Sequence, residues 1–332
     1  MKTSLEICAG AGGQALGIEQ AGFDHVALVE IDSHACNTLR LNRPKWNVMD
    51  ADVNEFNATK YLGVDLLAGG VPCPPFSKAG KQLGKDDERD LFPAMLRIAG
   101  ECSPKAIMIE NVPGLLEARF RDYRLSIESK LRRLGYVVLG WKLFNASDFG
   151  VPQLRPRVVM VALRQRYVPF FYWPEKHGEP ITVATALAGE MGMKGWQGIE
   201  QWKEKANKVA PTIVGGSKKH GGPDLGPTRA KRAWEELGVD GKGIANEPPD
   251  NDFMGLPRLT LKMVATLQGF PPDWQFSGKK TATYRQIGNA FPPPVARAIG
   301  DSIRKALLQE SQEPCSRKEL EQIEFRYYQE KL

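Results

Sequence analysis

One cysteine lies among prolines in the stretch GGVPCPPFSKAG, at residues 69–80. Cys73 follows Pro72 and precedes Pro74 and Pro75, and because proline fixes the backbone φ angle, the sulfur is held in one place. A thiol that only fills a core needs no such restraint, whereas a thiol that attacks a substrate must be positioned. The pattern therefore favours a nucleophilic cysteine, and the polar stretch 77–90 that follows is typical of a mobile lid.

Two other motifs carry groups that could assist such a nucleophile. Glu110 and Asn111 follow the apolar run AIMI, and a carboxyl beside a buried strand end has a raised pKa and can donate a proton. Gln153, Arg155 and Arg157 precede another apolar run, in QLRPRVVMVAL. Each motif alone has a structural explanation, but together at predicted strand ends they indicate an active site.

A glycine-rich turn indicates a nucleotide-like cofactor. In EICAGAGGQALG (6–17), Gly10 and Gly13 allow the backbone to approach a ligand closely, and the helix that follows offers free N–H groups. Glu30 ends the next apolar run, where a carboxylate binds ribose hydroxyls, and Asp52 could accept a hydrogen bond from an exocyclic amine. An adenosine-bearing cofactor is predicted, but these residues do not separate a nicotinamide cofactor from S-adenosylmethionine.

The elements that must position these residues follow from the hydrophobic pattern. Apolar runs rich in β-branched residues predict strands at 4–10, 25–32, 64–70, 105–112, 137–146 and 157–164, and helical patterns lie at 91–102 and 122–135. This alternation predicts an α/β fold with a doubly wound, mostly parallel sheet. The candidate residues then lie at the carboxyl ends of strands, where such sheets bind ligands.

The composition changes near residue 165 and predicts a second domain. The segment 166–257 is rich in Gly, Pro, Lys and Trp and has little clean periodicity, which returns at 259–270 and 295–310. We expect one domain formed by 1–165 and 258–332, with a smaller domain at 166–257. The charged end, 311–332, is typical of a surface helix.

Composition limits the classes of function. The net charge of +6 and the pI of about 9.0 fit a polyanionic partner, although an inert basic surface fits equally well. Five cysteines without a CxxC pair argue against disulfides and zinc and fit a reducing cytoplasm, and four scattered histidines argue against Ser–His or Cys–His hydrolysis. The sequence has no run of 18 apolar residues and reaches glycine too early for a secretory signal, so we expect neither a membrane span nor secretion.

The motifs in this order resemble the cytosine-5 DNA methyltransferases. EICAGAGG is similar to the first motif of that family, PCPPFS to its catalytic motif, ENVPGL to its ENV motif and QLRPR to its Q-R-R motif. The stretches 258–271 and 286–300 resemble the two C-terminal motifs, so the similarity covers residues 4–164 and 258–305. Cys8 stands where many members have a phenylalanine that packs on the cofactor, and Phe291 is bulkier than the usual small aliphatic residue.

The resemblance implies a covalent mechanism on a cytosine flipped out of duplex DNA. Cys73 would attack C6, Glu110 would contact N3 and the exocyclic N4, and Arg157 would hold O2, with Arg155 and Asn111 supporting the pocket. After methyl transfer a base, which the motifs do not identify, would remove the C5 proton. No metal is implied.

The resemblance also assigns binding residues. The S-adenosylmethionine pocket would be formed by Cys8, Ala9, Gly10, Gly13, Glu30, Ile31, Asp52, Val53, Pro72, Leu91, Asn289 and Ala290. The segment 166–257 would recognise the target sequence, and the residues expected to face DNA are Ser77, Lys218, Lys219, Arg229, Lys231 and Arg232, with Arg229 as the candidate to contact a base.

The expected partner is double-stranded DNA, and the protein is expected to be a monomer. No regulatory domain precedes the first motif, which fits a cytoplasmic bacterial modification enzyme that accompanies a restriction endonuclease.

Three alternatives are weaker. An NAD-dependent dehydrogenase would explain the glycine turn and Glu30 but leaves Cys73, Glu110 and QLRPR unexplained. An RNA cytosine methyltransferase shares these motifs, but the long basic insert at 166–257 favours duplex DNA. A DNA-binding module without activity does not need Cys73, Glu110 and Arg157 together.

Overall fold

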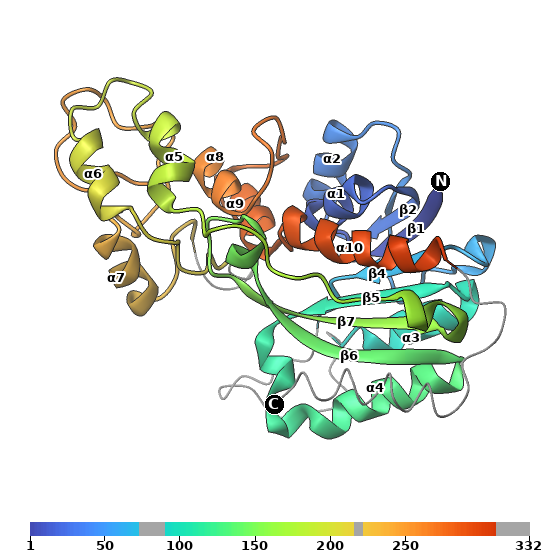
Figure 1. Cartoon of the computed structure of the whole chain (residues 1–332). Helices are drawn as coiled ribbons and strands as arrows, with labels where there is room; N and C mark the ends of the chain where they lie inside the picture. The colour runs from blue at the N-terminus through green and yellow to red at the C-terminus, as the bar shows by residue number, and fades with distance from the viewer. Residues whose placement is uncertain (73–89, 216–221, 310–332) are drawn as a thin grey trace.

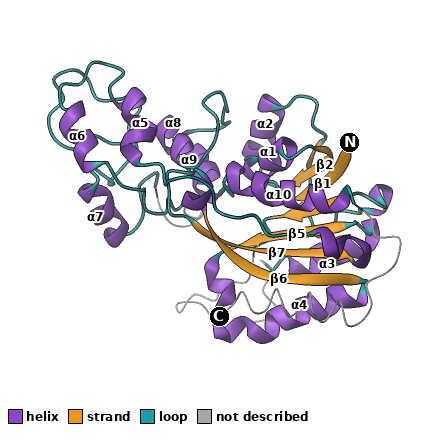
Figure 2. Ribbon diagram, in the orientation of Figure 1, coloured by secondary structure: helices purple, strands orange, loops and turns teal. Residues whose placement is uncertain are grey.

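A seven-stranded sheet in the order β3-β2-β1-β4-β5-β7-β6 forms the centre of the larger lobe (Figures 1 and 2). The structure, a computed structural model, describes residues 1–72, 90–215 and 222–309. Strands β1 to β5 run parallel, whereas β7 is antiparallel to both β5 and β6. The strands are β1 Lys2–Ile7, β2 Phe23–Glu30, β3 Val48–Asp50, β4 Leu66–Gly69, β5 Ala106–Asn111, β6 Tyr136–Asn145 and β7 Pro156–Arg164.

Helices cover both faces of the sheet, because the parallel strands are apolar on both sides. Leu5 and Ile7 of β1 pack into a cluster with α3 (Phe92–Cys102) and α4 (Arg121–Arg133). Leu66 and Ala68 of β4 pack on the opposite face with α1 (Gly13–Gln20) and α10 (Pro293–Leu307). Helix α2 (Ser33–Asn42) lies beside α1 in Figure 1. Helix α10, the last of the described helices, thus completes a face of the sheet formed by the N-terminal half.

The predicted α/β class and mostly parallel sheet are confirmed. Each predicted run holds a strand, with ends that differ by a few residues. Strand β3 was marked by no apolar run because it spans only three residues at the sheet edge, none of them buried. Short 3-10 turns lie at Thr59–Tyr61, Pro113–Leu116, Ala118–Phe120, Ala146–Phe149 and Gln165–Phe170.

A second lobe lies beside the sheet and is almost free of strands in its described part (Figure 2). Its helices are α5 Val183–Met191, α6 Ile199–Lys205, α7 Thr228–Glu236, α8 Leu261–Leu267 and α9 Lys280–Asn289. One apolar cluster joins residues of α5 to α7 with residues of α8 and α9. The division of the chain at 166 and 258 stays a prediction. Among the described helices, none is long and apolar enough to cross a membrane.

Candidate active site

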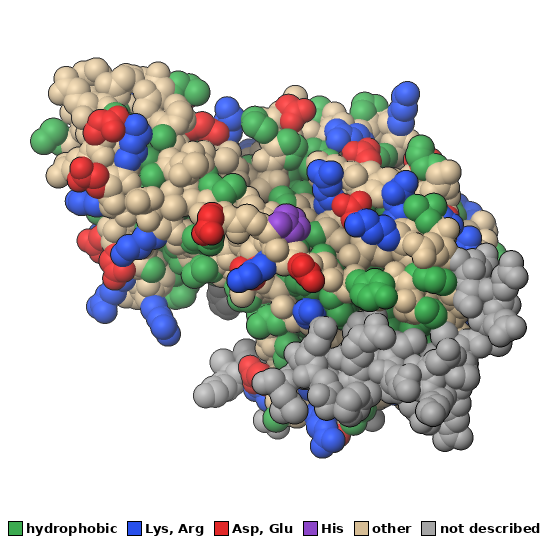
Figure 3. Space-filling model, in the orientation of Figure 1, with side chains coloured by type: hydrophobic (Ala, Val, Ile, Leu, Met, Phe, Trp, Pro, Cys, Tyr) green, Lys and Arg blue, Asp and Glu red, His purple; other side chains and the backbone are tan. Residues whose placement is uncertain are grey.

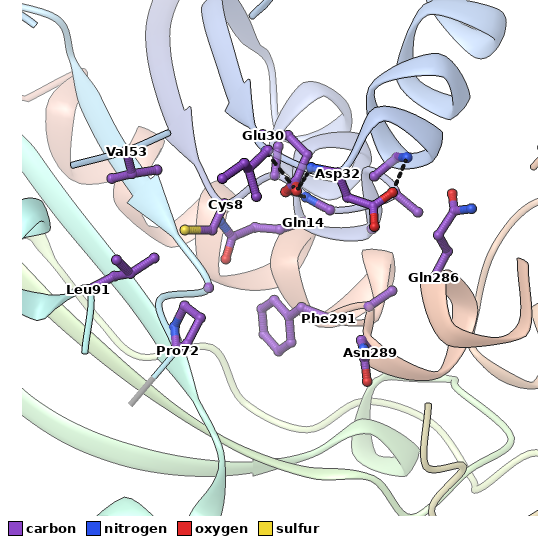
Figure 4. A pocket seen from close by; sticks show the side chains of 18 of the residues that line it. Cys8, Gln14, Glu30, Asp32, Val53, Pro72, Leu91, Gln286, Asn289 and Phe291 are labelled. Atoms are coloured by element: carbon purple, nitrogen blue, oxygen red, sulfur yellow. Dashed lines mark hydrogen bonds between the residues drawn. The ribbon is translucent and has the colours of Figure 1, made fainter. Parts of the chain in front are cut away.

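A cavity of about 760 Å³ opens where β1 to β5 end. All twelve residues predicted for a cofactor pocket line it: Cys8, Ala9, Gly10, Gly13, Glu30, Ile31, Asp52, Val53, Pro72, Leu91, Asn289 and Ala290. Figure 4 shows Val53 and Leu91 at one end and Gln286 and Asn289 at the other. The structure therefore brings together loops that follow four strands and a turn from the far end of the chain.

Nine further lining residues were not predicted from the sequence: Ala11, Gln14, Asp32, Ala35, Asn54, Gly70, Arg285, Gln286 and Phe291. Arg285 and Gln286 precede Asn289 by one turn of α9. Helical spacing from Asn289 would have identified both, since residues three and four apart share a helix face.

Glu30 is fixed at the tip of β2 by three backbone N–H groups. Its Oε2 accepts from Gly10 N at 2.8 Å, and its Oε1 accepts from Ile31 N at 2.9 Å and Asp32 N at 2.8 Å. Gly10 has a left-handed φ of +54°, a conformation that favours glycine. The carboxylate thus ties the glycine turn to the end of β2 and holds both at the cavity wall.

Glu110 and Arg157 form a buried ion pair at the β5 side of the cavity. Arg157 Nε lies 2.9 Å from Glu110 Oε1, and the two side chains are only 12% and 13% exposed. Burial raises the pKa of Glu110, while the positive charges of Arg157 and Arg155 act in the opposite direction. A Cβ on Gly70 would lie 3.0 Å from Glu110 Oε2, so the missing side chain leaves room for this carboxyl group. The pair places a carboxyl group with a raised pKa beside a guanidinium group.

The family is decided by a match of residues 2–305 to the model of the C-5 cytosine-specific DNA methylases. The chain belongs to this family. It is 58% identical over 314 residues to the Type II methyltransferase M.NgoMIV of Neisseria gonorrhoeae, covering 93% of this chain and 99% of that protein. It is 56% identical over 314 residues to the Type II methyltransferase M.NaeI of Lentzea aerocolonigenes, covering 93% and 76%.

The fold is also similar to that of solved structures. A crystal structure described as a DNA modification methyltransferase encoded within an Escherichia coli prophage matches with a TM-score of 0.68 and 24% identity, over 93% of this chain and 100% of that chain. DNMT2 of Spodoptera frugiperda matches with a TM-score of 0.63 and 19% identity, over 92% and 100%. At these identities the likeness supports the fold.

In this DNA methylase, Asn111 orients the backbone that leads to the proline-fenced cysteine. Its Nδ2 donates to Val71 O at 2.9 Å, and its Oδ1 accepts from Val112 N at 2.8 Å. Cys73 itself lies outside the described residues, as do Ser77, Lys218 and Lys219 and most of the expected lid. The described chain reaches Pro72, which lines the cavity.

Cys8 lines the cavity of the methylase, but its thiol is not suited to nucleophilic attack. Burial raises the pKa of its thiol well above the usual range, and the carboxylates of Glu30 and Asp52 raise it further. Its φ of +52° is unusual for a residue with a side chain. Since the thiol stays neutral, Cys8 serves as a small packing group where many members of the family have an aromatic ring.

The predicted DNA-facing residues in the described part lie on α7. Arg229 and Arg232 are exposed, whereas the Nζ of Lys231 pairs with Asp224 Oδ2 at 2.8 Å. Figure 3 shows Lys and Arg side chains on the part of the lobe where α7 lies. No group of His, Cys, Asp and Glu side chains among the described residues could hold a metal ion.

Proposed function

We propose that this methylase transfers a methyl group from S-adenosylmethionine to C5 of one cytosine within a specific duplex DNA sequence, with Cys73 as nucleophile. The observation that carries the proposal is the buried Glu110–Arg157 pair at the cavity that also contains the Glu30 turn. A single cavity thus has room for a cofactor and, beside it, groups suited to a cytosine ring.

The charges at the cavity favour S-adenosylmethionine over a dinucleotide. Four carboxyl groups line it, those of Glu30, Asp32, Asp52 and Glu110, and Arg285 pairs with Asp32 at 3.4 Å. Such a lining disfavours a pyrophosphate and suits a sulfonium cation together with ribose hydroxyls. A Cβ on Gly10 would meet nothing within 4 Å, so the turn leaves open space for a ligand. When bound, S-adenosylmethionine supplies the methyl group.

The residues of the chain would overcome the low nucleophilicity of C5. The Cys73 thiolate adds to C6 of the flipped base, and the electron pair of the C5–C6 bond then becomes available at C5 for bonding to the methyl carbon. Glu110, whose pKa is raised by burial, would donate a proton to N3, and Arg157 would bind O2 while it orients Glu110. Loss of the C5 proton to a base restores the double bond and releases the Cys73 thiolate.

The test is covalent trapping. Bisulfite sequencing of DNA from a host that expresses this chain would identify the methylated site, and a duplex with 5-fluorocytosine at that site would then be incubated with the protein and S-adenosylmethionine. We expect a stable protein–DNA adduct, because fluorine replaces the C5 hydrogen that a base must remove before Cys73 is released. Cys73→Ala should form no adduct, while Cys102→Ala, which removes a buried thiol of α3, should form it normally. Adduct formation by Cys73→Ala would refute the assignment.

We further propose a biological context. The names of the two relatives above support a role as the modification enzyme of a Type II restriction-modification system, in which a cognate endonuclease cleaves the unmodified site. We place the enzyme in the bacterial cytoplasm, acting as a monomer. Residues 166–257, with Arg229, Lys231 and Arg232 on α7, would recognise the target together with Lys218, Lys219 and Ser77.

A further inference from the structure

The described residues just before and at Gly215 lie directly against the turn that carries Asn289. A Cβ on Gly215 would lie 2.8 Å from Arg285 O and 2.8 Å from Asn289 Cγ, and would overlap Asn289 Oδ1. A Cβ on Gly288 would lie 2.5 Å from Gly215 N. Contacts this close require glycine on both sides. Gly215 belongs to the segment assigned to target recognition, whereas Asn289 and Arg285 line the cofactor cavity.

A network of buried side chains fixes this contact, which we call the Gly215 junction. Arg155, only 1% exposed, donates through Nη1 to Ile213 O at 2.8 Å. Its Nη2 donates to Gly288 O at 2.7 Å and to Ala290 O at 2.9 Å. One guanidinium group therefore links the chain just before Gly215 to both neighbours of Asn289.

Two glutamines reinforce the same segments. Gln153, which is fully buried, accepts from Ile213 N at 2.8 Å through Oε1 and donates to Gln268 Oε1 at 2.8 Å. Gln268 donates in turn to Ala290 O at 2.6 Å. The backbone of Ile213 is thus held through both its N–H and its carbonyl, and Ala290 O accepts from two side chains. These hydrogen bonds hold the backbone at Ile213 and at Ala290 in fixed positions relative to each other.

We propose that residues 213–215 brace the wall of the cofactor cavity, and that Gly215 and Arg155 are positioning residues that act on cofactor binding through Asn289. The inference rests on the proposed cofactor site. If the inference is right, the segment 166–257 supports cofactor binding as well as DNA recognition. Arg155 is then a positioning residue and not a group that touches the substrate.

The test measures binding of S-adenosylhomocysteine by titration calorimetry, without DNA or turnover. Gly215→Ala forces Asn289 and the Arg285 carbonyl away, and we expect at least tenfold weaker binding. Gly189→Ala is the matched control, because Gly189 lies in α5 of the same segment and a Cβ there would meet nothing within 4 Å. Its affinity should stay within twofold of that of the unaltered protein.

A double-mutant cycle shows whether the effect passes through Asn289. Asn289→Ala removes one of the groups with which the new methyl group collides. In the Asn289→Ala background, we expect Gly215→Ala to weaken binding of S-adenosylhomocysteine threefold or less. An equal loss in both backgrounds would mean that Gly215 acts independently of Asn289, and the inference would fall.

A second variant covers the case in which Gly215→Ala does not fold, as judged by circular dichroism. Lysine cannot donate to three carbonyl groups from one planar fork, so Arg155→Lys should also weaken binding at least tenfold. The unaltered protein is expected to bind S-adenosylhomocysteine. If Arg155→Lys and a folded Gly215→Ala bind it with the same affinity as the unaltered protein, only the proposed bracing role is refuted. If the unaltered protein does not bind S-adenosylhomocysteine, the proposed cofactor is wrong and the inference falls with it.

Discussion

Glu6 of β1 is a buried carboxyl group directly beneath the glycine turn. It has no exposed surface, and neither its oxygens nor the amide of Gln14 meet a hydrogen-bond partner of good geometry among the described residues. Burial raises the pKa of Glu6 well above its usual value; the nearby Gln14 amide lowers it in part, and the charge of Glu30 raises it again. The folded protein therefore holds the Glu6 proton to a higher pH than the unfolded chain does.

This protonation predicts a pH-dependent stability that Glu6→Gln should remove. The pKa of Glu6 is higher in the folded than in the unfolded chain, so above about pH 4.3 the folded state retains a proton that the unfolded state releases. The free energy of unfolding should fall by about 1.4 kcal/mol per pH unit until the folded pKa is passed. Glutamine releases no proton, so the variant should gain stability relative to the unaltered protein as the pH rises above the unfolded pKa of glutamate.

Urea unfolding of the two proteins at a series of pH values measures this difference. Glu204→Gln, at an exposed position, is the matched control and should follow the unaltered protein. Parallel stability curves for Glu6→Gln and the unaltered protein would show that Glu6 is ionised in the fold.

At the scale of elements, α7 separates two kinds of basic residue. Lys231 is held by Asp224 at 2.8 Å in the loop before the helix, and the buried Trp234 anchors the helix to the lobe. Arg229 and Arg232 are exposed and lie three residues apart, so they share a face. This arrangement leaves the two arginines available for DNA, while Lys231 supports the loop.

We expect Arg229→Ala to reduce discrimination at one base position by about 1–3 kcal/mol, because arginine donates two hydrogen bonds to a guanine edge. Arg232→Ala should instead weaken binding to all sequences alike and reduce its salt dependence, as the loss of a phosphate contact does. Binding to the methylated site and to single-base variants of it, over a range of salt, measures both effects.

Arg133→Ala, on α4 of the other lobe, is the control for the change in net charge. If Arg229→Ala bound every duplex with the same affinity as the unaltered protein, α7 would be excluded from base recognition.

At the scale of the whole molecule, helices from distant parts of the sequence pack together where α1 contacts α10. Gly17 allows the contact, since a Cβ there would lie 2.6 Å from Ala296 Cβ and 2.7 Å from Arg297 N. Gly17→Ala should therefore lower the free energy of unfolding by about 1–3 kcal/mol through overpacking. Because α1 follows the glycine turn, we also expect weaker cofactor binding.

Denaturant unfolding with Gly189→Ala as control measures the effect, since alanine at that helical position has open space and a better helix propensity. A stability equal to that of the unaltered protein would mean that the helices separate at little cost.

The sequence alone determined the family and the sheet class, and it identified twelve of the residues that line the cavity. Residue type, motif order and hydrophobic period are local properties, and the carboxyl ends of parallel strands must meet at one edge of a sheet. Glu30 and Asp52 could therefore be assigned to one cavity from their positions at predicted strand ends, and Pro72 and Asn289 could be assigned to it through the motifs that contain them. The roles proposed for Cys73 and the DNA-facing residues stay predictions.

Only the tertiary structure decided what Arg155 and Gly215 contact. The partners of Arg155 are the backbone carbonyls of Ile213, Gly288 and Ala290. Because every residue has a backbone carbonyl, the sequence does not indicate which ones Arg155 contacts. Gly215 is one of 33 glycines, and its need for glycine arises from a neighbour more than 70 positions away. Long-range backbone contacts depend on how whole elements pack, and for that reason the junction between the lobes could not be predicted from the sequence.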